Sequence, residues 1–214
     1  MSERALREEI VAVAQAIDRA GYCPSKSGNV SARLGDDLLI TPSGLPYAQT
    51  TPEDLIHLSL DGRILSGVRK PSSEWPFHTA IYRARPDAQA IVHTHSPRAT
   101  ALSCARRGIP AFHYMIALCG GPDVRCADYA TFGTPELAEN AVQGLEGRKA
   151  VLLANHGVIA LGASLAGAHQ IVAEVENLAG QYLDLLAAGL DPVILDDGEM
   201  QRVAARFAGY GKVD

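Results

Sequence analysis

PSSEWPFHTAIYRARPDAQAIVHTH, residues 71–95, is the stretch around which the rest of the chain is organised. Toward its end, residues 89–93 form an apolar, partly β-branched run, a composition that favours a β-strand. Alternate side chains on a strand share a face, so His93 and His95 are expected to point the same way and Thr94 to the opposite face. Two imidazoles in this relation can bind one divalent metal ion.

A third imidazole is available much later in the chain. His156 lies between Asn155 and Gly157, directly after the apolar run AVLLA. A lone histidine at a strand end is usually an ordinary polar residue. However, His-X-His closing one strand, with another histidine closing a second strand, predicts a metal site. Three histidines match a catalytic zinc ion, which keeps one coordination position open.

Glu74 belongs to the same compact region as the two neighbouring histidines. It follows Ser72 and Ser73 in a Lys-Pro-Ser-Ser turn that enters a predicted helix. Beside a metal ion held by three histidines, a carboxylate can complete the coordination shell or move protons once substrate displaces it. The alternative is a solvent-facing glutamate that stabilises the helix N-terminus by its charge. Spacing alone does not distinguish the two roles.

Three turns of small residues have the composition of an anion-binding cradle. Backbone N–H groups at turns and helix starts, together with hydroxyl groups, can bind a phosphate, and Lys26 can add positive charge. Each turn alone is a common feature of proteins, and only the coincidence with a metal site makes them candidates. The turns are Ser27-Gly28-Asn29, Ser43-Gly44 and Ser72-Ser73.

The composition predicts one large domain over residues 1–214, because 47% of the residues are hydrophobic and only 20% are charged. The net charge is -5 and no block of Lys and Arg stands out, so nucleic acid and anionic membranes are poor partners. No apolar window approaches ~18 residues, so we expect no segment that spans a membrane.

The N-terminal residues and the cysteines indicate the compartment. The first twenty-one residues are charged and amphipathic, and they lack the continuous apolar core of a signal peptide. Four cysteines form no Cys-X-X-Cys pair and are expected to be free, reduced thiols. They are Cys23, Cys104, Cys119 and Cys126. These features predict a cytoplasmic protein.

Strands and helices are predicted to alternate along the chain. Helical spacing of apolar residues predicts helices over residues 3–19, 74–85, 97–107, 134–145, 164–188 and 196–207. Apolar runs bounded by turns predict strands within residues 25–33, 38–46, 89–93, 111–117, 150–154 and 158–161. Residues 55–65 read as a hairpin around Asp61-Gly62. Because of the hairpins, we expect an α/β sandwich with a mostly antiparallel or mixed central sheet.

The order and spacing of these motifs resemble the class II aldolase/adducin family. The likeness runs from the first helix to Tyr210 through SGNVSAR, LLITPSGLPY, KPSSEWPFH, IVHTHS, HYMIA, DYATFGT, NHGVIA and a terminal YG. The resemblance implies one domain of this type over residues 1–214, with a three-layer α/β/α fold around a nine-stranded, mostly antiparallel mixed sheet. It also implies a homotetramer with active sites at subunit boundaries.

The resemblance also assigns roles to individual residues. It implies one divalent ion per chain, Zn2+ or another cation such as Mn2+ or Co2+, bound by His93, His95 and His156 with Glu74. It makes Glu74 the catalytic glutamate. The implied phosphate pocket consists of Gly28, Asn29, Ser43, Gly44, Ser72 and Ser73, and the implied aldehyde-positioning aromatics are Tyr114, Phe132 and Tyr210.

Two positions depart from the pattern of the family's aldolases. Lys26 stands where they usually have a small hydroxyl residue, which puts the details of the phosphate pocket in question. Asn155 stands where they tend to carry a second histidine, which puts the surroundings of the metal ligands in question. Neither departure removes a reacting group.

The activity implied by the resemblance is that of a metal-dependent aldolase, an aldehyde-lyase. It would cleave a ketose 1-phosphate to dihydroxyacetone phosphate and an aldehyde by a retro-aldol step through a metal-stabilised enediolate. The expected substrate is L-fuculose 1-phosphate or a 5-deoxy- or 5-methylthio-pentulose 1-phosphate. The aldehyde half stays open.

Other activities on the same scaffold are a 4-epimerase of pentulose 5-phosphates and a dehydratase of methylthioribulose 1-phosphate. A non-enzymatic alternative is an adducin-like binding module without the metal. The presence of His93, His95, His156 and Glu74 argues against that module.

Overall fold

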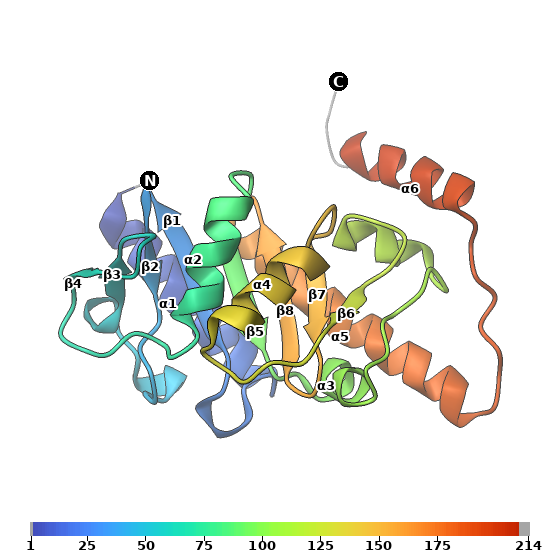
Figure 1. Ribbon diagram of the computed structural model, residues 1–214, viewed down its shortest axis with the longest axis horizontal. Helices are drawn as coiled ribbons and strands as arrows, with labels where there is room; N and C mark the ends of the chain where they lie inside the picture. The colour runs from blue at the N-terminus through green and yellow to red at the C-terminus, as the bar shows by residue number, and fades with distance from the viewer. Residues whose placement is uncertain (1, 210–214) are drawn as a thin grey trace.

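An eight-stranded sheet forms the centre of the computed structural model, which describes residues 2–209 of the chain (Figure 1). The strand order is β4-β3-β2-β1-β5-β8-β7-β6, and every neighbouring pair is antiparallel except β6 and β7. The strands are β1 (Asn29–Leu34), β2 (Asp37–Ile40), β3 (Ile56–Leu58), β4 (Ile64–Ser66), β5 (Ala90–Thr94), β6 (Arg125–Ala127), β7 (Ala150–Leu153) and β8 (Gly157–Gly162).

Helices cover both faces of this sheet. The six α-helices are α1 (Glu3–Arg19), α2 (Trp75–Ala84), α3 (Pro97–Cys104), α4 (Pro135–Gly144), α5 (Leu165–Ala187) and α6 (Asp197–Gly209). In Figure 1, α2 and α4 lie in front of the sheet, while α1 and α5 lie behind it. Within the described residues no helix is long and apolar enough to cross a membrane.

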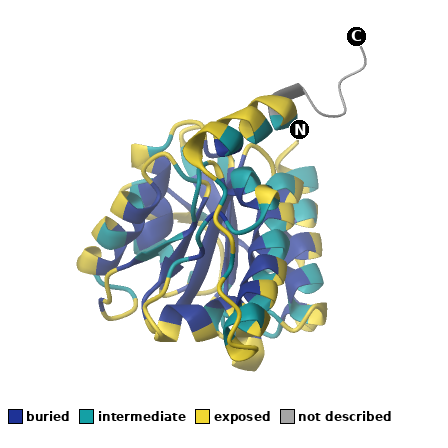
Figure 2. Ribbon diagram, turned by 90° about the vertical axis from the view of Figure 1, so that its right-hand side faces the viewer, coloured by how far each residue is buried: buried dark blue, intermediate teal, exposed yellow. Residues whose placement is uncertain are grey.

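The period-two pattern of each strand divides the core into two clusters. On β5, Ile91 packs with the residues of α2 and α4, whereas Val92 packs with those of α1, α3 and α5. Burial of one such side chain stabilises the fold by about 1.5–3 kcal/mol. Figure 2 shows the buried residues concentrated in the sheet and on the inner helix faces. The expected three-layer α/β/α architecture with a mostly antiparallel mixed sheet is therefore confirmed.

Strand β5 occupies the middle of the sheet, between β1 and β8, and all five of its residues are buried. Its register places His93 opposite Asn29 on β1 and opposite Ile159 on β8. The end of β5, the start of β1 and the start of β8 thus lie side by side at one end of the central strands. This end of the strands carries the residues of the candidate site.

Most predicted elements are present with nearly the expected ends. Thr134 is the N-cap of α4, and its side chain accepts a hydrogen bond from the Leu137 N–H group. The hairpin at Asp61-Gly62 forms between β3 and β4. Gly62 has a φ of 87°, and a Cβ there would lie 2.4 Å from the Trp75 ring, so the turn requires glycine.

The strand predicted over residues 111–117 is wrong. The structure has a 3-10 helix at Tyr114–Cys119, and its buried residues Ile116 and Cys119 pack against the α5 side of the core. The His113 side chain accepts a hydrogen bond from Met115 N, and Gly120 ends the helix with a φ of 89°. These residues are apolar because the 3-10 helix is partly buried, and not because they belong to a strand of the sheet.

Two further differences concern the sheet. Strand β6 was not predicted, because its three residues carry no strand-like pattern. The nine-stranded sheet implied by the resemblance is also wrong for residues 2–209, in which eight strands pair. The four cysteines are free, as expected.

Candidate metal centre

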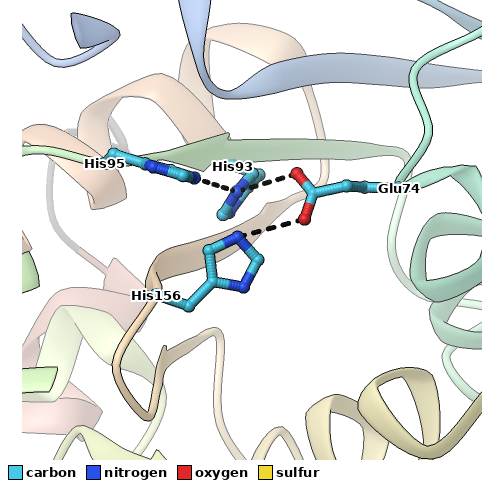
Figure 3. Close-up of side chains that lie close together, drawn as sticks. All are labelled: Glu74, His93, His95 and His156. Atoms are coloured by element: carbon cyan, nitrogen blue, oxygen red, sulfur yellow. Dashed lines mark hydrogen bonds and ion pairs between the residues drawn. The ribbon is translucent and has the colours of Figure 1, made fainter. Parts of the chain in front are cut away.

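Four side chains converge where the central strand β5 ends (Figure 3). His93 lies on β5, His95 directly follows that strand, His156 lies in the turn before β8, and Glu74 is the residue before α2. One ligand atom from each side chain lies within 4.8 Å of the others. The predicted convergence of the three histidines and Glu74 is therefore present in the structure.

The turn between β7 and β8 aims His156 at the other ligands. Asn155 adopts a left-handed φ of 55°, which reverses the chain. A Cβ at Gly157 would lie 2.4 Å from the Thr94 carbonyl oxygen and 3.1 Å from the His95 ring. Only glycine fits here, and this close approach brings His156 against the end of β5.

Glu74 does not cap its helix. It occupies the N-cap position of α2, but its side chain makes no capping hydrogen bond and only 7% of the residue is exposed. The carboxylate turns inward, with Oε2 3.1 Å from His93 Nε2 and Oε1 3.0 Å from His156 Nε2. The alternative role, a solvent-facing glutamate at a helix start, is excluded by this burial.

The charge state of Glu74 follows from two opposing effects. Burial raises the pKa of the carboxyl, but the charges and hydrogen bonds of His93 and His156 outweigh burial and hold this pKa well below its ordinary value. The carboxylate is therefore ionised at neutral pH. Burial, followed by the charges of His93 and His156, lowers the pKa of His95 to about 3, so this ring is neutral.

The donor set fits a divalent cation. His93 Nδ1 lies 3.0 Å from the Val158 carbonyl oxygen, which only accepts, so Nδ1 carries a proton and Nε2 faces the site. His93 Nε2 lies 3.1 Å from Glu74 Oε2, and two acceptors so close repel unless a cation or proton separates them. Glu74 Oε1 is buried and makes no well-aligned hydrogen bond. Three imidazoles and one carboxylate suit zinc and similar ions.

A cavity of about 290 Å³ opens above these ligands. Its lining includes every residue predicted for the phosphate pocket: Gly28, Asn29, Ser43, Gly44, Ser72 and Ser73. Glu74, His95 and His156 form part of the same wall, while His93 is fully buried. One cavity therefore combines the metal ligands with the three small-residue turns.

Backbone contacts hold the three turns together. The bridge between Pro42 and Pro71 joins two of them, and Ser72 N donates to the Thr41 carbonyl at 3.1 Å. In the third turn, a Cβ at Gly28 would lie 2.7 Å from the His93 carbonyl oxygen, so this position also requires glycine. The turn at Gly28 thus rests directly on the strand that carries a metal ligand.

The two positions that depart from the family pattern also line the cavity. Lys26 is exposed and has a left-handed φ of 65°, which places a cation beside the serine and glycine turns. The Asn155 side-chain oxygen accepts a hydrogen bond from Arg106 Nε at 3.1 Å. Asn155 therefore contacts the α3 side of the site.

The predicted aromatic residues are not all in the cavity. Phe132 lines it and is 65% exposed. Tyr114 is 50% exposed, stacks between His113 and Phe207, and is absent from the lining of its own chain's cavity. Tyr210 lies outside the described residues.

Sequence reasoning missed one aromatic residue at this opening. Tyr129 also lines the cavity and is 50% exposed. The signal was present, because Tyr129 lies in the same DYATFGT motif as Phe132. The opening of the cavity therefore carries two exposed aromatic rings.

Comparison with known proteins places these features in context. Residues 8–183 match the sequence profile of the family described as Class II Aldolase and Adducin N-terminal domain. The 5-methylthioribulose-1-phosphate/5-deoxyribulose-1-phosphate aldolase of Rhodospirillum rubrum is 49% identical over 98% of this chain and 94% of its own length. The L-fuculose phosphate aldolase of Escherichia coli is 45% identical over 99% of this chain and 98% of its own. A solved L-fuculose 1-phosphate aldolase superposes with a TM-score of 0.93 at 40% identity, covering 97% of this chain and 98% of that chain.

Proposed function

The chain belongs to the class II aldolase and adducin family and is a class II aldolase, and we propose that it cleaves a ketose 1-phosphate to dihydroxyacetone phosphate and an aldehyde. The observation that carries this proposal is the shared cavity. Its wall presents three histidines and a glutamate at one part and three turns of small residues at another. A sugar phosphate has the two groups, vicinal oxygens and a phosphate, that these parts recognise.

The proposed cofactor is one Zn2+ per chain, with Mn2+ or Co2+ as alternatives, held by His93, His95, His156 and Glu74. When bound, such an ion supplies Lewis-acid stabilisation for negative charge that develops on adjacent substrate oxygens. The neutral His95 is in the protonation state that metal binding requires, and the contact of His93 Nδ1 with a backbone carbonyl directs Nε2 at the site.

Glu74 is proposed to carry the proton of the reaction. In the cleavage, the C4 hydroxyl loses its proton, the C3–C4 bond breaks, and the electron pair of that bond stays on the C3 side as an enediolate. C3 then takes up a proton, so the reaction neither gains nor loses protons overall. A buried, ionised carboxylate beside the metal ligands suits this transfer.

The three turns are proposed to bind the phosphate. Gly28, Gly44 and Ser73 present their turns to the cavity, and Ser73 lies at the N-terminal end of α2, where N–H groups attract anions. The Ser43 and Ser72 hydroxyls and the Asn29 amide add donors, and Lys26 adds charge. A phosphate held there sets the distance between C1 and the metal ligands.

The proposed substrate is L-fuculose 1-phosphate or a 5-deoxy- or 5-methylthio-pentulose 1-phosphate. These compounds share the part that becomes dihydroxyacetone phosphate and differ in the aldehyde. We propose that Phe132 contacts the aldehyde half, because it stands exposed at the cavity opening. Tyr114 and Tyr210 are proposed to orient the aldehyde oxygen.

We propose a homotetramer of single-domain chains in which each site lies at a subunit boundary. Tyr114 supports this assembly, because half of the residue is exposed and it lies outside the cavity of its own chain. In the assembly, Tyr114 and Tyr210 of one chain would complete the site of a neighbouring chain. Light scattering of the purified protein measures the mass directly, and an active monomer would contradict the shared site.

The proposed reaction is tested by product analysis. The protein with added Zn2+ is incubated with L-fuculose 1-phosphate, 5-deoxyribulose 1-phosphate and 5-methylthioribulose 1-phosphate, and dihydroxyacetone phosphate is measured. We expect release from at least one of them, and release at least ~100-fold slower from the Glu74→Gln control. Loss of water from the methylthio compound would indicate a dehydratase, and inversion at C4 of a pentulose 5-phosphate an epimerase. Bound metal without any turnover would favour an adducin-like binding module.

A further inference from the structure

A chain of buried hydrogen bonds leads away from the Glu74 carboxylate, and its members beyond Asn29 take no part in the proposed metal binding or phosphate binding. Asn29 Nδ2 donates to Glu74 Oε2 at 2.9 Å. On its other side, Asn29 Oδ1 lies 2.5 Å from His78 Nε2. His78 Nδ1 lies 2.7 Å from Ser31 Oγ, which lies 2.9 Å from the Tyr82 hydroxyl. Five side chains are thus connected in series.

Two secondary-structure elements supply this chain of contacts. His78 and Tyr82 are four residues apart on α2 and so share one helix face, and Glu74, the residue before this helix, lies four positions before His78. Asn29 and Ser31 are two residues apart on β1 and so share one strand face. None of the five is more than 7% exposed, and His78 is fully buried. Such burial is tolerated only when polar groups have partners, as they do here.

The donors and acceptors admit one arrangement. Because Asn29 Nδ2 donates to the carboxylate, Asn29 Oδ1 is an acceptor and His78 Nε2 carries the proton. Burial, followed by the charge of His93, lowers the pKa of His78 to about 3, so the ring holds a single proton. His78 Nδ1 therefore accepts from the Ser31 hydroxyl, which accepts from Tyr82. Every donor points toward Glu74.

We propose that His78 is a positioning residue for Glu74 and acts through the Asn29 amide. By donating to Asn29 Oδ1, His78 fixes which end of the amide faces the carboxylate. The reversed amide would set an oxygen against Glu74 Oε2 and repel it. The inference rests on the proposed role of Glu74 as proton carrier, and it explains how this side chain keeps one orientation between the phosphate turns and the metal ligands.

The first test uses no catalysis. Long-range nitrogen–proton NMR spectra of the full-length protein with 15N-labelled histidine, recorded with and without Zn2+, report the proton position on each ring. We expect a neutral His78 with its proton on Nε2 from pH 6 to pH 8. The signal is assigned by its loss in His78→Phe. A proton on Nδ1, or a ring that titrates in this range, overturns the proposal.

The second test separates positioning from folding by comparing two substitutions. His78→Phe keeps a ring beside Phe77, whose centroid lies 4.6 Å from that of His78, and removes both hydrogen bonds. We expect kcat to fall about 10–100-fold, the range for partners that orient metal-site groups, with KM within about threefold. His78→Gln offers one donor and one acceptor and should recover most of kcat.

A matched control lies in the other helix layer. Tyr182→Phe removes a buried hydroxyl that accepts from Arg107 Nε at 3.1 Å, far in sequence from the site. Its kcat should equal that of the wild type. Wild-type kcat in a folded His78→Phe protein, or equal losses in the Phe and Gln variants, would overturn the positioning role while leaving the proposed aldolase intact. If the wild type releases no dihydroxyacetone phosphate, the proposed function fails instead, and the NMR spectra still decide the hydrogen-bond chain.

Discussion

The floor and the rim of the cavity are built in different ways. We define the floor as Glu74 and His93, with 7% and 0% exposure, and the rim as Phe132 and Tyr129, with 65% and 50%. The floor is fixed by paired strands and by a helix start, so its side chains have one arrangement. The rim stands on a connecting segment and faces outward. From this difference we infer that the floor residues set the chemistry and the rim residues select the aldehyde. The proposed contacts of Tyr114 and Tyr210 from a neighbouring chain would complete the rim.

The largest effect should follow removal of a floor ligand. His93→Ala takes away the most buried of the three ligand imidazoles and leaves a hole that the rigid strand β5 cannot close. We expect strong loss of the bound ion by metal analysis and activity near the detection limit. His169→Ala, at a half-buried position on α5 and outside the ligand set, is the control and should leave both unchanged. Full metal content with unchanged turnover would remove His93 from the ligand set.

Glu74→Gln should separate metal binding from chemistry. The amide is nearly the same size as the carboxylate but cannot accept and return a proton. We expect turnover to fall by about 10²–10⁴, the usual contribution of general acid–base catalysis, with an unchanged fold and most of the metal retained. Circular dichroism, metal analysis and the cleavage rate measure the three quantities. Near-wild-type turnover would mean that Glu74 has no part in proton transfer.

Changes at the rim should be smaller and should alter selectivity. Phe132→Ala removes an exposed ring, so we expect the preference between two aldehyde halves, measured as a ratio of kcat/KM, to change about tenfold. Inhibition by inorganic phosphate should stay the same, since the phosphate turns are untouched. An equal loss of kcat/KM on all substrates would show that Phe132 acts like a floor residue and has no part in selecting the aldehyde.

The C-terminal residues offer a second test of the rim. Deleting residues 210–214 removes Tyr210 and should spare folding, metal content and the tetramer mass, while reducing turnover and the stereochemical choice at the aldehyde carbon. Product diastereomer ratios and light scattering make the comparison. A truncated protein with the kinetics of the full chain would assign Tyr210 no catalytic role.

The smallest effect concerns stability and pH. The pKa of His78 is lowered to about 3, below the ordinary ~6.5, so between these values the unfolded chain binds a proton that the native state does not. The free energy of unfolding therefore does not depend on His78 protonation above ~pH 6.5, and it decreases as the pH falls below this value. From pH 7 to pH 5, metal-free wild type should lose about 2 kcal/mol more than His78→Phe. Urea unfolding measures this difference, and parallel losses would show that His78 is protonated in the native state.

The histidine part of the floor was predictable from sequence because its signals are local. His-X-His at the end of an apolar run, and glycines where a chain must pass closely, follow from strand geometry and from steric limits. The inward turn of Glu74 was not decidable, because a helix start suits both a capping and a buried carboxylate. The structure decides it through contacts with His93 and His156, which lie far along the chain.

Other features depend on contacts that local patterns do not encode. Residues 111–117 are apolar because they pack under α5, and their hydrophobicity does not distinguish a 3-10 helix from a strand. The partners of His78 lie on β1, 47 and 49 residues away in the chain, so its role was invisible until the two elements were placed together. The proposed role of Tyr114 in the site of a neighbouring chain would likewise depend on contacts between subunits, which patterns within one chain do not encode.

In the proposed active site, three histidines and Glu74 hold one catalytic divalent ion. Anomalous diffraction from crystals grown with Zn2+, recorded above and below the zinc absorption edge, tests it most directly. We expect one strong peak per chain, about 2.0–2.2 Å from the Nε2 atoms of His93, His95 and His156 and from a Glu74 oxygen. An active protein with no peak at this position, or with its only peak elsewhere, would contradict this metal site.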